Sequence, residues 1–408
     1  MADSDDLDTT LELFLLVVLA LFFAIFGISL FGIQGGALSY NPDATYGLLL
    51  FLAGVQAIAL GKTPFGDFQR SPLIVAAGFL IVAFGLLGCF VPGITYTALR
   101  NTTGILMAVG APILMIITWT GQNKARFWWR AGGNVRHLAL ASTEVYLLMF
   151  LLGLVTLVPT LATNAAVSVL TLLMSLALFH LVWAMFWISR NYPQQWQTRN
   201  SQLLGAGATA PLLRRSCLGF PIAVLALFGL ILTMVGGLLL LVGRGVLPFS
   251  PDGQFAVVLT VMAIQIGCLG ETPIGTFRRN WLIKVTALLC AGLGIASAIT
   301  PGGIPALVPI VLAALSVGGG AMMLWGAFSA KMADLRNPGA ELGPIRNKLR
   351  YLWFNLVLQA LMVILFGLAT FFPTILSLSV TAIILLAYGL LMFDLTRAAY
   401  SLGKLSPA

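Results

Sequence analysis

Long apolar runs recur along the whole chain, and they constrain its fold more than any other feature. A helix needs about 20 apolar residues to cross the hydrocarbon layer of a bilayer. Inside lipid every backbone amide must be hydrogen-bonded within the protein, so a spanning run is a helix. The sequence therefore predicts an all-α polytopic membrane protein with twelve transmembrane helices. The runs lie at about 13–33, 46–61, 73–91, 102–120, 145–159, 165–188, 221–243, 254–270, 282–299, 306–328, 352–372 and 374–393.

The composition agrees with a membrane protein and argues against other classes. Only 9% of the 408 residues are charged and 59% are hydrophobic, whereas a soluble domain carries roughly 25% charged residues. The formal net charge is +9, but the basic residues lie in short loops and form no contiguous basic face. We therefore expect the lipid bilayer as a partner and no nucleic acid.

The basic residues also predict the orientation of the chain in the membrane. Of the 22 lysines and arginines, all except Arg100 and Arg244 fall in loops on one side of the predicted bundle. Cytoplasmic loops carry the excess of Lys and Arg. We therefore expect a multi-pass protein of the cell inner (plasma) membrane, with both the N-terminus and the C-terminus in the cytoplasm.

One polar, turn-rich segment occurs twice in the chain. Gln56–Arg70 and Gln265–Arg279 share the pattern G-x-T-P-x-G-x-F-x-R, and the second copy follows the first by 209 residues. Two halves of six helices each have the same orientation, which predicts two parallel repeats related by a pseudo-two-fold axis along the membrane normal. The predicted domains are a first six-helix repeat (1–188), a cytoplasmic linker (189–220) and a second six-helix repeat (221–408). Prolines of the predicted outer turns recur at a similar spacing, as Pro42 and Pro251, Pro92 and Pro301, and Pro159 and Pro373.

Polar side chains inside the predicted spans are candidates for a substrate path. Gln56 and Gln265 occupy equivalent positions of the two repeats, and their amides suit a neutral or zwitterionic solute. His180 and Gln359 are further candidates for this path. The alternative for each is an interhelical hydrogen bond, which contributes on the order of 1 kcal/mol. No Asp, Glu, Lys or Arg lies near the middle of a predicted run, which argues against a proton-driven pump.

Arginine and tryptophan side chains in the predicted cytoplasmic loops are candidates for contacts with lipid headgroups. Arg70, Arg278 and Arg279 end the repeated segment, where they can reach phosphates. The alternatives for this segment are a structural turn and a gate. Trp128 and Trp129 lie between two arginines, a pattern typical of an interfacial anchor. The alternative for these tryptophans is a patch that docks a protein partner at the cytoplasmic face.

The sequence contains no evident set of residues for catalysis or metal binding. Its four cysteines form no C-x-x-C pair, and its two histidines are His137, in a predicted loop, and His180. Structural metal and redox sites use closely spaced ligands of these types. We therefore expect no enzyme activity, no metal and no cofactor.

Three predicted hairpins share a local pattern, in which Gly-Leu is followed by a few apolar residues, a proline and another apolar helix. In this pattern the chain resembles the HdeD-like membrane proteins of bacterial stress response, here in duplicated form. The resemblance implies an inner-membrane protein without a known reaction, and it carries over no active residue. The hairpins run from Gly85-Leu86 to Pro92, from Gly153-Leu154 to Pro159 and from Gly367-Leu368 to Pro373.

The two six-helix halves, each with a basic loop after its second helix, also resemble the major facilitator transporters. The loop departs from their signature, because Asp67 lies six residues after Gly61 and the second copy has Thr276 there. Two functions remain open. The first is a permease for a neutral or zwitterionic small solute, with a path between the repeats, which the duplicated architecture favours. The second is a non-catalytic accessory or scaffold protein, HdeD-like or a subunit of a larger membrane complex, which the scarcity of polar residues in the spans favours.

Overall fold

The computed structural model describes residues 4–59, 72–93, 95–121, 124–158, 160, 164–191, 220–268, 281–302, 307–329, 336, 343–372 and 377–403. In this part of the chain the long elements are all helices, and no strand occurs. Most of the predicted linker at 189–220 lies outside the described residues. The elements are α1 (Ser4–Gln34), α2 (Pro42–Ala59), α3 (Pro72–Phe90), α4 (Tyr96–Ile116), the short π-helix η1 (Ile117–Gly121), α5 (Lys124–Ala131), α6 (Gly133–Leu157), α7 (Asn164–Asn191), α9 (Phe220–Gly243), α10 (Pro251–Cys268), α11 (Trp281–Ile299), α12 (Leu307–Phe328), α14 (Gly343–Phe371) and α15 (Leu378–Gly403).

Nine helices within the described ranges are long and apolar enough to cross a membrane. The apolar helices Pro42–Ile58 and Lys284–Ile299 are shorter. The structure thus agrees with the prediction of an all-α, multi-pass membrane protein, whereas the number of twelve spans stays a prediction. The nine candidate spans are Leu13–Gln34, Leu73–Phe90, Tyr96–Thr120, Gly133–Leu157, Ala165–Ile188, Leu225–Gly243, Leu307–Phe328, Asn347–Phe371 and Leu378–Ala398.

The predicted start of the run at 145–159 is wrong, and the error bears on the polar residues. The apolar run expected at 145–159 belongs to α6, which already begins at Gly133. Hydropathy starts the run late because polar residues such as His137 and Glu144 interrupt the apolar pattern, yet the helix continues through them. The candidate span Gly133–Leu157 therefore contains Glu144 near its middle, so the expectation that no charged residue lies near the middle of a span fails here.

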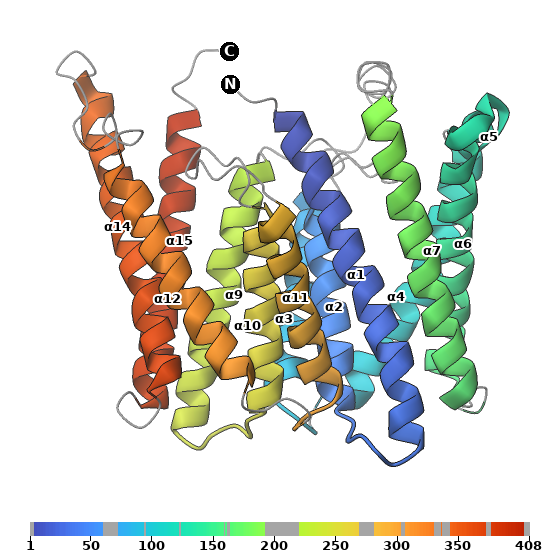
Figure 1. Ribbon diagram of the computed structural model, residues 1–408, viewed down its shortest axis with the longest axis horizontal. Helices are drawn as coiled ribbons and strands as arrows, with labels where there is room; N and C mark the ends of the chain where they lie inside the picture. The colour runs from blue at the N-terminus through green and yellow to red at the C-terminus, as the bar shows by residue number, and fades with distance from the viewer. Residues whose placement is uncertain are drawn as a thin grey trace.

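The helices pack as six close pairs. These are α1 with α7, α2 with α3, α4 with α6, α9 with α15, α10 with α11, and α12 with α14. In Figure 1 the pairs α2–α3 and α10–α11 lie at the centre, whereas α6 with α7 and α14 with α15 lie on opposite flanks. The two central pairs contact each other, and α1 and α9 each pack against the central pair that is not nearest in sequence. The centre of the molecule is therefore built from α1, α2, α3, α9, α10 and α11.

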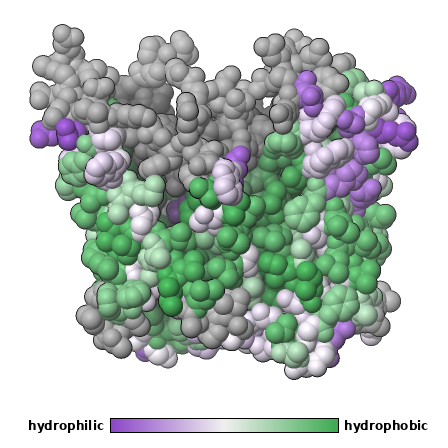
Figure 2. All heavy atoms as spheres, viewed as in Figure 1, coloured by the Kyte–Doolittle hydropathy of each residue, from purple (hydrophilic) through white to green (hydrophobic). Residues whose placement is uncertain are grey.

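The two ends of the bundle differ in character. Helix α1 begins and α15 ends at the top of Figure 1, which also holds α5, and we call this the terminal end. The opposite end, which we call the proline-turn end, carries the turns at Pro42, Pro92, Pro251 and Pro301. On the face shown in Figure 2, an apolar band crosses the bundle, and the hydrophilic residues gather mainly above it. A bilayer requires such a band.

Glycines bring several helix backbones into direct contact. A Cβ atom at Gly85 on α3 would lie 2.6 Å from the carbonyl oxygen of Gly47 on α2. A Cβ at Gly47 would in turn lie 2.7 Å from the carbonyl oxygen of Gly85. Gly389 and Gly229 make a similar contact between α15 and α9, where a Cβ at Gly389 would lie 2.9 Å from the Gly229 carbonyl oxygen. Helices associate in lipid through small-residue contacts of this kind, because the hydrophobic effect does not drive them together there.

The substitution Gly85→Ala tests this close packing. The added methyl group would press on the backbone of α2, and we expect a loss of about 1–3 kcal/mol, as for other overpacked cores. The measurement is thermal unfolding of the purified protein in detergent. Gly318→Ala on α12 is the control, because a Cβ there meets nothing within 4 Å and alanine favours the helix by roughly 0.5–1 kcal/mol. Equal unfolding temperatures for the two variants would contradict the packing described.

Candidate functional site

Reciprocal hydrogen bonds join the central helices at the proline-turn end. The amide of Asn41, just before α2, donates to the carbonyl oxygen of Ile299 at the end of α11 (3.1 Å). The amide of Ser250, just before α10, donates to the carbonyl oxygen of Phe90 at the end of α3 (3.2 Å). The side-chain amide of Asn41 also reaches the Ser250 hydroxyl at 3.5 Å, and these two residues are 209 positions apart. The junction therefore joins residues separated by the same interval of 209 positions as the segments Gln56–Arg70 and Gln265–Arg279.

Close packing surrounds this junction. Phe90, whose carbonyl oxygen accepts the hydrogen bond from Ser250, is fully buried. A Cβ at Gly253, in the first turn of α10, would collide with the backbone carbonyl oxygen of Cys89, near the end of α3. The arrangement leaves no room for a solute between α3 and α10 at this end.

The two glutamines predicted to line a path lie toward the other end of the same central helices. Gln56 is in the last turn of α2 and Gln265 is in the last turn of α10, and both side chains are half-buried. Gln265 lies beside the hydroxyl of Tyr388 on α15. Within the described residues, no hydrogen bond joins Gln56 to Gln265. The structure thus places the two glutamines on helices that contact each other, α2 and α10, but their side chains form no hydrogen bond with each other.

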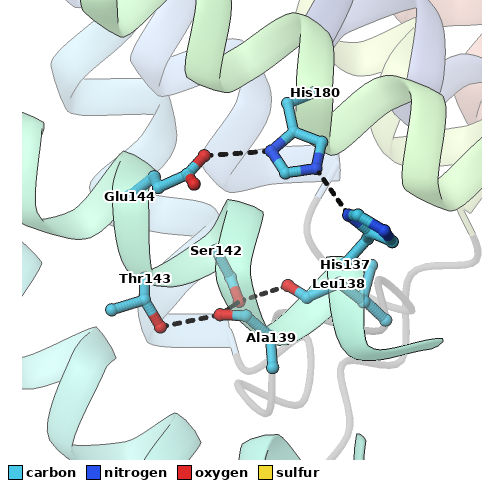
Figure 3. Close-up of polar contacts among 7 residues, drawn as sticks. All are labelled: His137, Leu138, Ala139, Ser142, Thr143, Glu144 and His180. Carbon is cyan, nitrogen blue, oxygen red and sulfur yellow. Dashed lines mark hydrogen bonds and ion pairs between the residues drawn. The ribbon is translucent and has the colours of Figure 1, made fainter. Parts of the chain in front are cut away.

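A cluster of three titratable side chains joins α6 to α7 (Figure 3). The Nδ1 atom of His180, on α7, lies 2.9 Å from Oε2 of Glu144 on α6. The Nε2 atom of His180 lies 3.2 Å from Nδ1 of His137, also on α6. The indole ring of Trp183 lies edge-on to the His137 ring, with the centroids 5.4 Å apart. His180, predicted as a path residue, is therefore the centre of a contact between two flanking helices.

The other polar side chains of this stretch of α6 are satisfied within the helix or by a neighbour. Ser142 donates to the carbonyl oxygen of Leu138 and Thr143 donates to that of Ala139, each at 2.7 Å (Figure 3). Thr143 also accepts a hydrogen bond from the indole N–H of Trp119 at 3.1 Å. Only the histidines and Glu144 of this group thus form a bridge to α7.

The bridge implies a definite arrangement of protons. An ionised Glu144 only accepts hydrogen bonds, so Nδ1 of His180 must carry the proton that it donates. In a neutral His180, Nε2 then has a free lone pair, and Nδ1 of His137 donates to it. The side-chain exposure of His180 is 27% and that of Glu144 is 48%, so the cluster lies at the surface of the bundle rather than in its core.

A second polar cluster joins α14 to α15. The carboxylate of Asp394 accepts hydrogen bonds from the Tyr351 hydroxyl and from the Asn355 side-chain amide, the latter at 3.0 Å. Gln359 donates to Oδ1 of Asn355 at 2.7 Å and lies 3.5 Å from the carbonyl oxygen of Leu391. Asn355 and Gln359 are almost fully buried. Gln359, predicted as a path residue, is therefore part of an interhelical network.

The two clusters occupy corresponding positions along the chain. Tyr351 follows His137 by 214 residues, and Asp394 follows His180 by the same interval. The members of each pair are 43 residues apart. This correspondence was not predicted from the sequence. The signal was present, because Pro159 and Pro373 are separated by the same 214 residues.

The short helix α5 carries the tryptophans predicted to contact lipid headgroups, and the structure separates their environments. Trp128 is buried at 2% exposure, whereas Trp129 is 40% exposed. The guanidinium of Arg136 stacks over the Trp129 ring at 3.8 Å from its centroid, a favourable cation–π geometry. Arg126 and Arg130 are also exposed. Trp129 and these arginines therefore face outward at the terminal end, while Trp128 packs inward.

Three residues predicted to contact lipid headgroups fall in parts of the chain that the structure does not describe. Arg70, Arg278 and Arg279 lie outside the described residues. Within the described ranges, no group of three or more His, Cys, Asp or Glu side chains is arranged to hold a metal ion together. Comparisons with protein-family models, with curated proteins and with solved structures find no match to this chain.

The substitution Asn355→Leu tests the α14–α15 network. Asn355 bridges Asp394 and Gln359, so its loss leaves a buried amide and a carboxylate each short of a partner. We expect destabilisation by about 1–3 kcal/mol, measured by thermal unfolding in detergent. Asn347→Leu is the matched control, because Asn347 is exposed on the same helix. If both substitutions shift the unfolding temperature equally, the network does not stabilise the hairpin.

Proposed function

We propose that the chain is a tandem duplication, with twelve transmembrane helices arranged as two parallel repeats, 1–188 and 221–408. The packing supports this proposal, because the pairs α1–α7, α2–α3 and α4–α6 correspond in order to α9–α15, α10–α11 and α12–α14. Backbone geometry recurs at the same interval of 209 residues. Gly36 and Gly245 both have φ of +70°, while Gly93 and Gly302 have φ of +83° and +76°. Positive φ at matching turns is a feature that only a small set of residues tolerates.

We further propose that the protein is a permease for a small neutral or zwitterionic solute, with its path between the repeats. The observation that carries this proposal is the closure of the centre at the proline-turn end. Reciprocal hydrogen bonds and glycine contacts seal the proline-turn end. Toward the other end of the same helices, Gln56 and Gln265 are half-buried. The proline-turn end is closed, and the amide side chains lie toward the opposite end. This arrangement is compatible with alternating access in which the proline-turn end acts as the gate.

The chemistry of the path restricts the solute class. Amide side chains donate and accept hydrogen bonds but hold no charge, so they favour solutes without net charge. With the termini in the cytoplasm of a bacterial-type inner membrane, the sealed end faces outward, and the arrangement described here is closed to the outside. The proposal includes no catalytic step and no cofactor.

A second function, a non-catalytic accessory or scaffold protein, is favoured by the flanks of the molecule. In the α14–α15 network, Asn355 donates to the carboxylate of Asp394 between the two helices, and Gln359 donates to Asn355 within α14. These polar side chains are therefore hydrogen-bonded to one another. The exposed Arg126, Trp129 and Arg130 on α5 form a basic, aromatic surface suited to a lipid headgroup layer or a protein partner. Purification at native abundance and identification of co-migrating proteins would reveal such a partner.

Transport into proteoliposomes tests the permease directly. Vesicles containing the purified chain are exposed to gradients of neutral and zwitterionic solutes, and their swelling is followed by light scattering. We expect at least one solute to enter faster than into protein-free vesicles. The double substitution Gln56→Leu and Gln265→Leu should reduce that rate by more than about tenfold, the effect of roughly 1.4 kcal/mol.

The control for this experiment is Gln34→Leu, which makes the same chemical change at an exposed residue at the proline-turn end of α1, away from Gln56 and Gln265. Its transport rate should equal that of the unmodified chain. Failure of every solute to exceed the protein-free rate would reject the permease and favour the accessory function.

A further inference from the structure

We propose that His137 and His180 form a binding site for a divalent transition-metal ion between α6 and α7. The two imidazoles come from different helices, and Nδ1 of His137 lies 3.2 Å from Nε2 of His180. Two nitrogens bound to one tetrahedral Zn²⁺ at about 2.0–2.1 Å are roughly 3.3–3.4 Å apart. The observed separation therefore already matches that of two ligands of one ion.

The carboxylate of Glu144 prepares His180 for this role. It lies 2.9 Å from Nδ1 of His180, and this contact fixes the proton on Nδ1 and directs the lone pair of Nε2 toward His137 (Figure 3). Metal-binding histidines usually donate their second N–H to a carboxylate or carbonyl in this way, which orients the ring and raises its basicity. Glu144 therefore lies on the far side of His180 and is a positioning residue rather than a ligand.

The ion would replace the hydrogen bond between the two histidines. To bind the ion, His137 needs to carry a proton on Nε2 alone, so that Nδ1 presents a lone pair. Because two imidazoles supply two of four ligands, water or a small anion would complete the coordination. The partial exposure of His180 and Glu144 leaves room for such ligands, and His137 lies in the second turn of α6, near the terminal end of the bundle.

The opposite flank provides an internal control. At the corresponding positions it has Tyr351 and Asp394, which are hydrogen-bonded to each other. A phenol and a single carboxylate are poorer ligands than imidazoles for ions such as Zn²⁺ and Cu²⁺. The site is therefore expected once per chain, on the α6–α7 flank alone, and it does not depend on whether the protein transports a solute.

Equilibrium dialysis of the full-length protein against Zn²⁺ tests the site. The protein is purified in detergent with an affinity tag that contains no histidine, treated with a chelator, dialysed and analysed by mass spectrometry for bound metal. We expect one Zn²⁺ per chain in the unmodified protein and loss of this ion in His137→Ala and in His180→Ala. Glu144→Gln should weaken binding by about 10- to 100-fold, as for other outer carboxylates of metal sites.

The control is Asp394→Asn, which alters the opposite flank and should retain the ion. Circular dichroism checks that each variant is folded, and His137→Asn and His180→Asn replace any alanine variant that is not. Electron paramagnetic resonance of the unmodified protein with Cu²⁺ is an independent measurement, and it should show coupling to two nitrogens. Zn²⁺ binding that is absent from the unmodified protein, or unchanged in both histidine variants, would overturn the proposal, as would a Cu²⁺ spectrum without nitrogen coupling.

Discussion

The structure depends above all on the two reciprocal backbone hydrogen bonds that join its central helices at the proline-turn end. The amides of Asn41 and Ser250 precede α2 and α10, so they have no partner within a helix. A buried amide without a partner is costly, and each of these donates instead to the last turn of a helix from the other half of the chain. Each of these bonds therefore satisfies a backbone amide at the start of one helix and also fixes the two central pairs relative to each other.

Glycine contacts extend this constraint through the central pairs. With their backbones in contact at Gly47 and Gly85, α2 and α3 form one closely packed unit. On the flanks, polar clusters hold α6 to α7 and α14 to α15. A molecule built from such units moves most readily at the junctions between them, because packed pairs resist continuous deformation. The proline-turn junction joins the two central pairs, and it is where we propose the gate.

Much of the fold could be predicted from the sequence, because a bilayer allows few alternatives. Apolar runs locate most of the helices, as with the run at 73–91 and α3 (Pro72–Phe90). The predictions fail where helices contain polar residues, as at the start of α6, since hydropathy does not register residues that find a partner on another helix. The partners of His180 and Gln359 could not be predicted for the same reason. Helix pairing brings Glu144 to His180 and Asn355 to Asp394, and no local pattern encodes these contacts.

The most direct test of the central junction is a disulfide between its two halves. In a chain whose four native cysteines are replaced, Asn41→Cys and Ser250→Cys are combined with a protease site between residues 189 and 220. Mild oxidation in native membranes should link the cleaved halves unless a reductant is present. The pair Asn41→Cys and Ser377→Cys, at the same end but just before the flanking helix α15, should not link them. Halves that separate in both cases would contradict the junction and, with it, the proposed gate between two repeats.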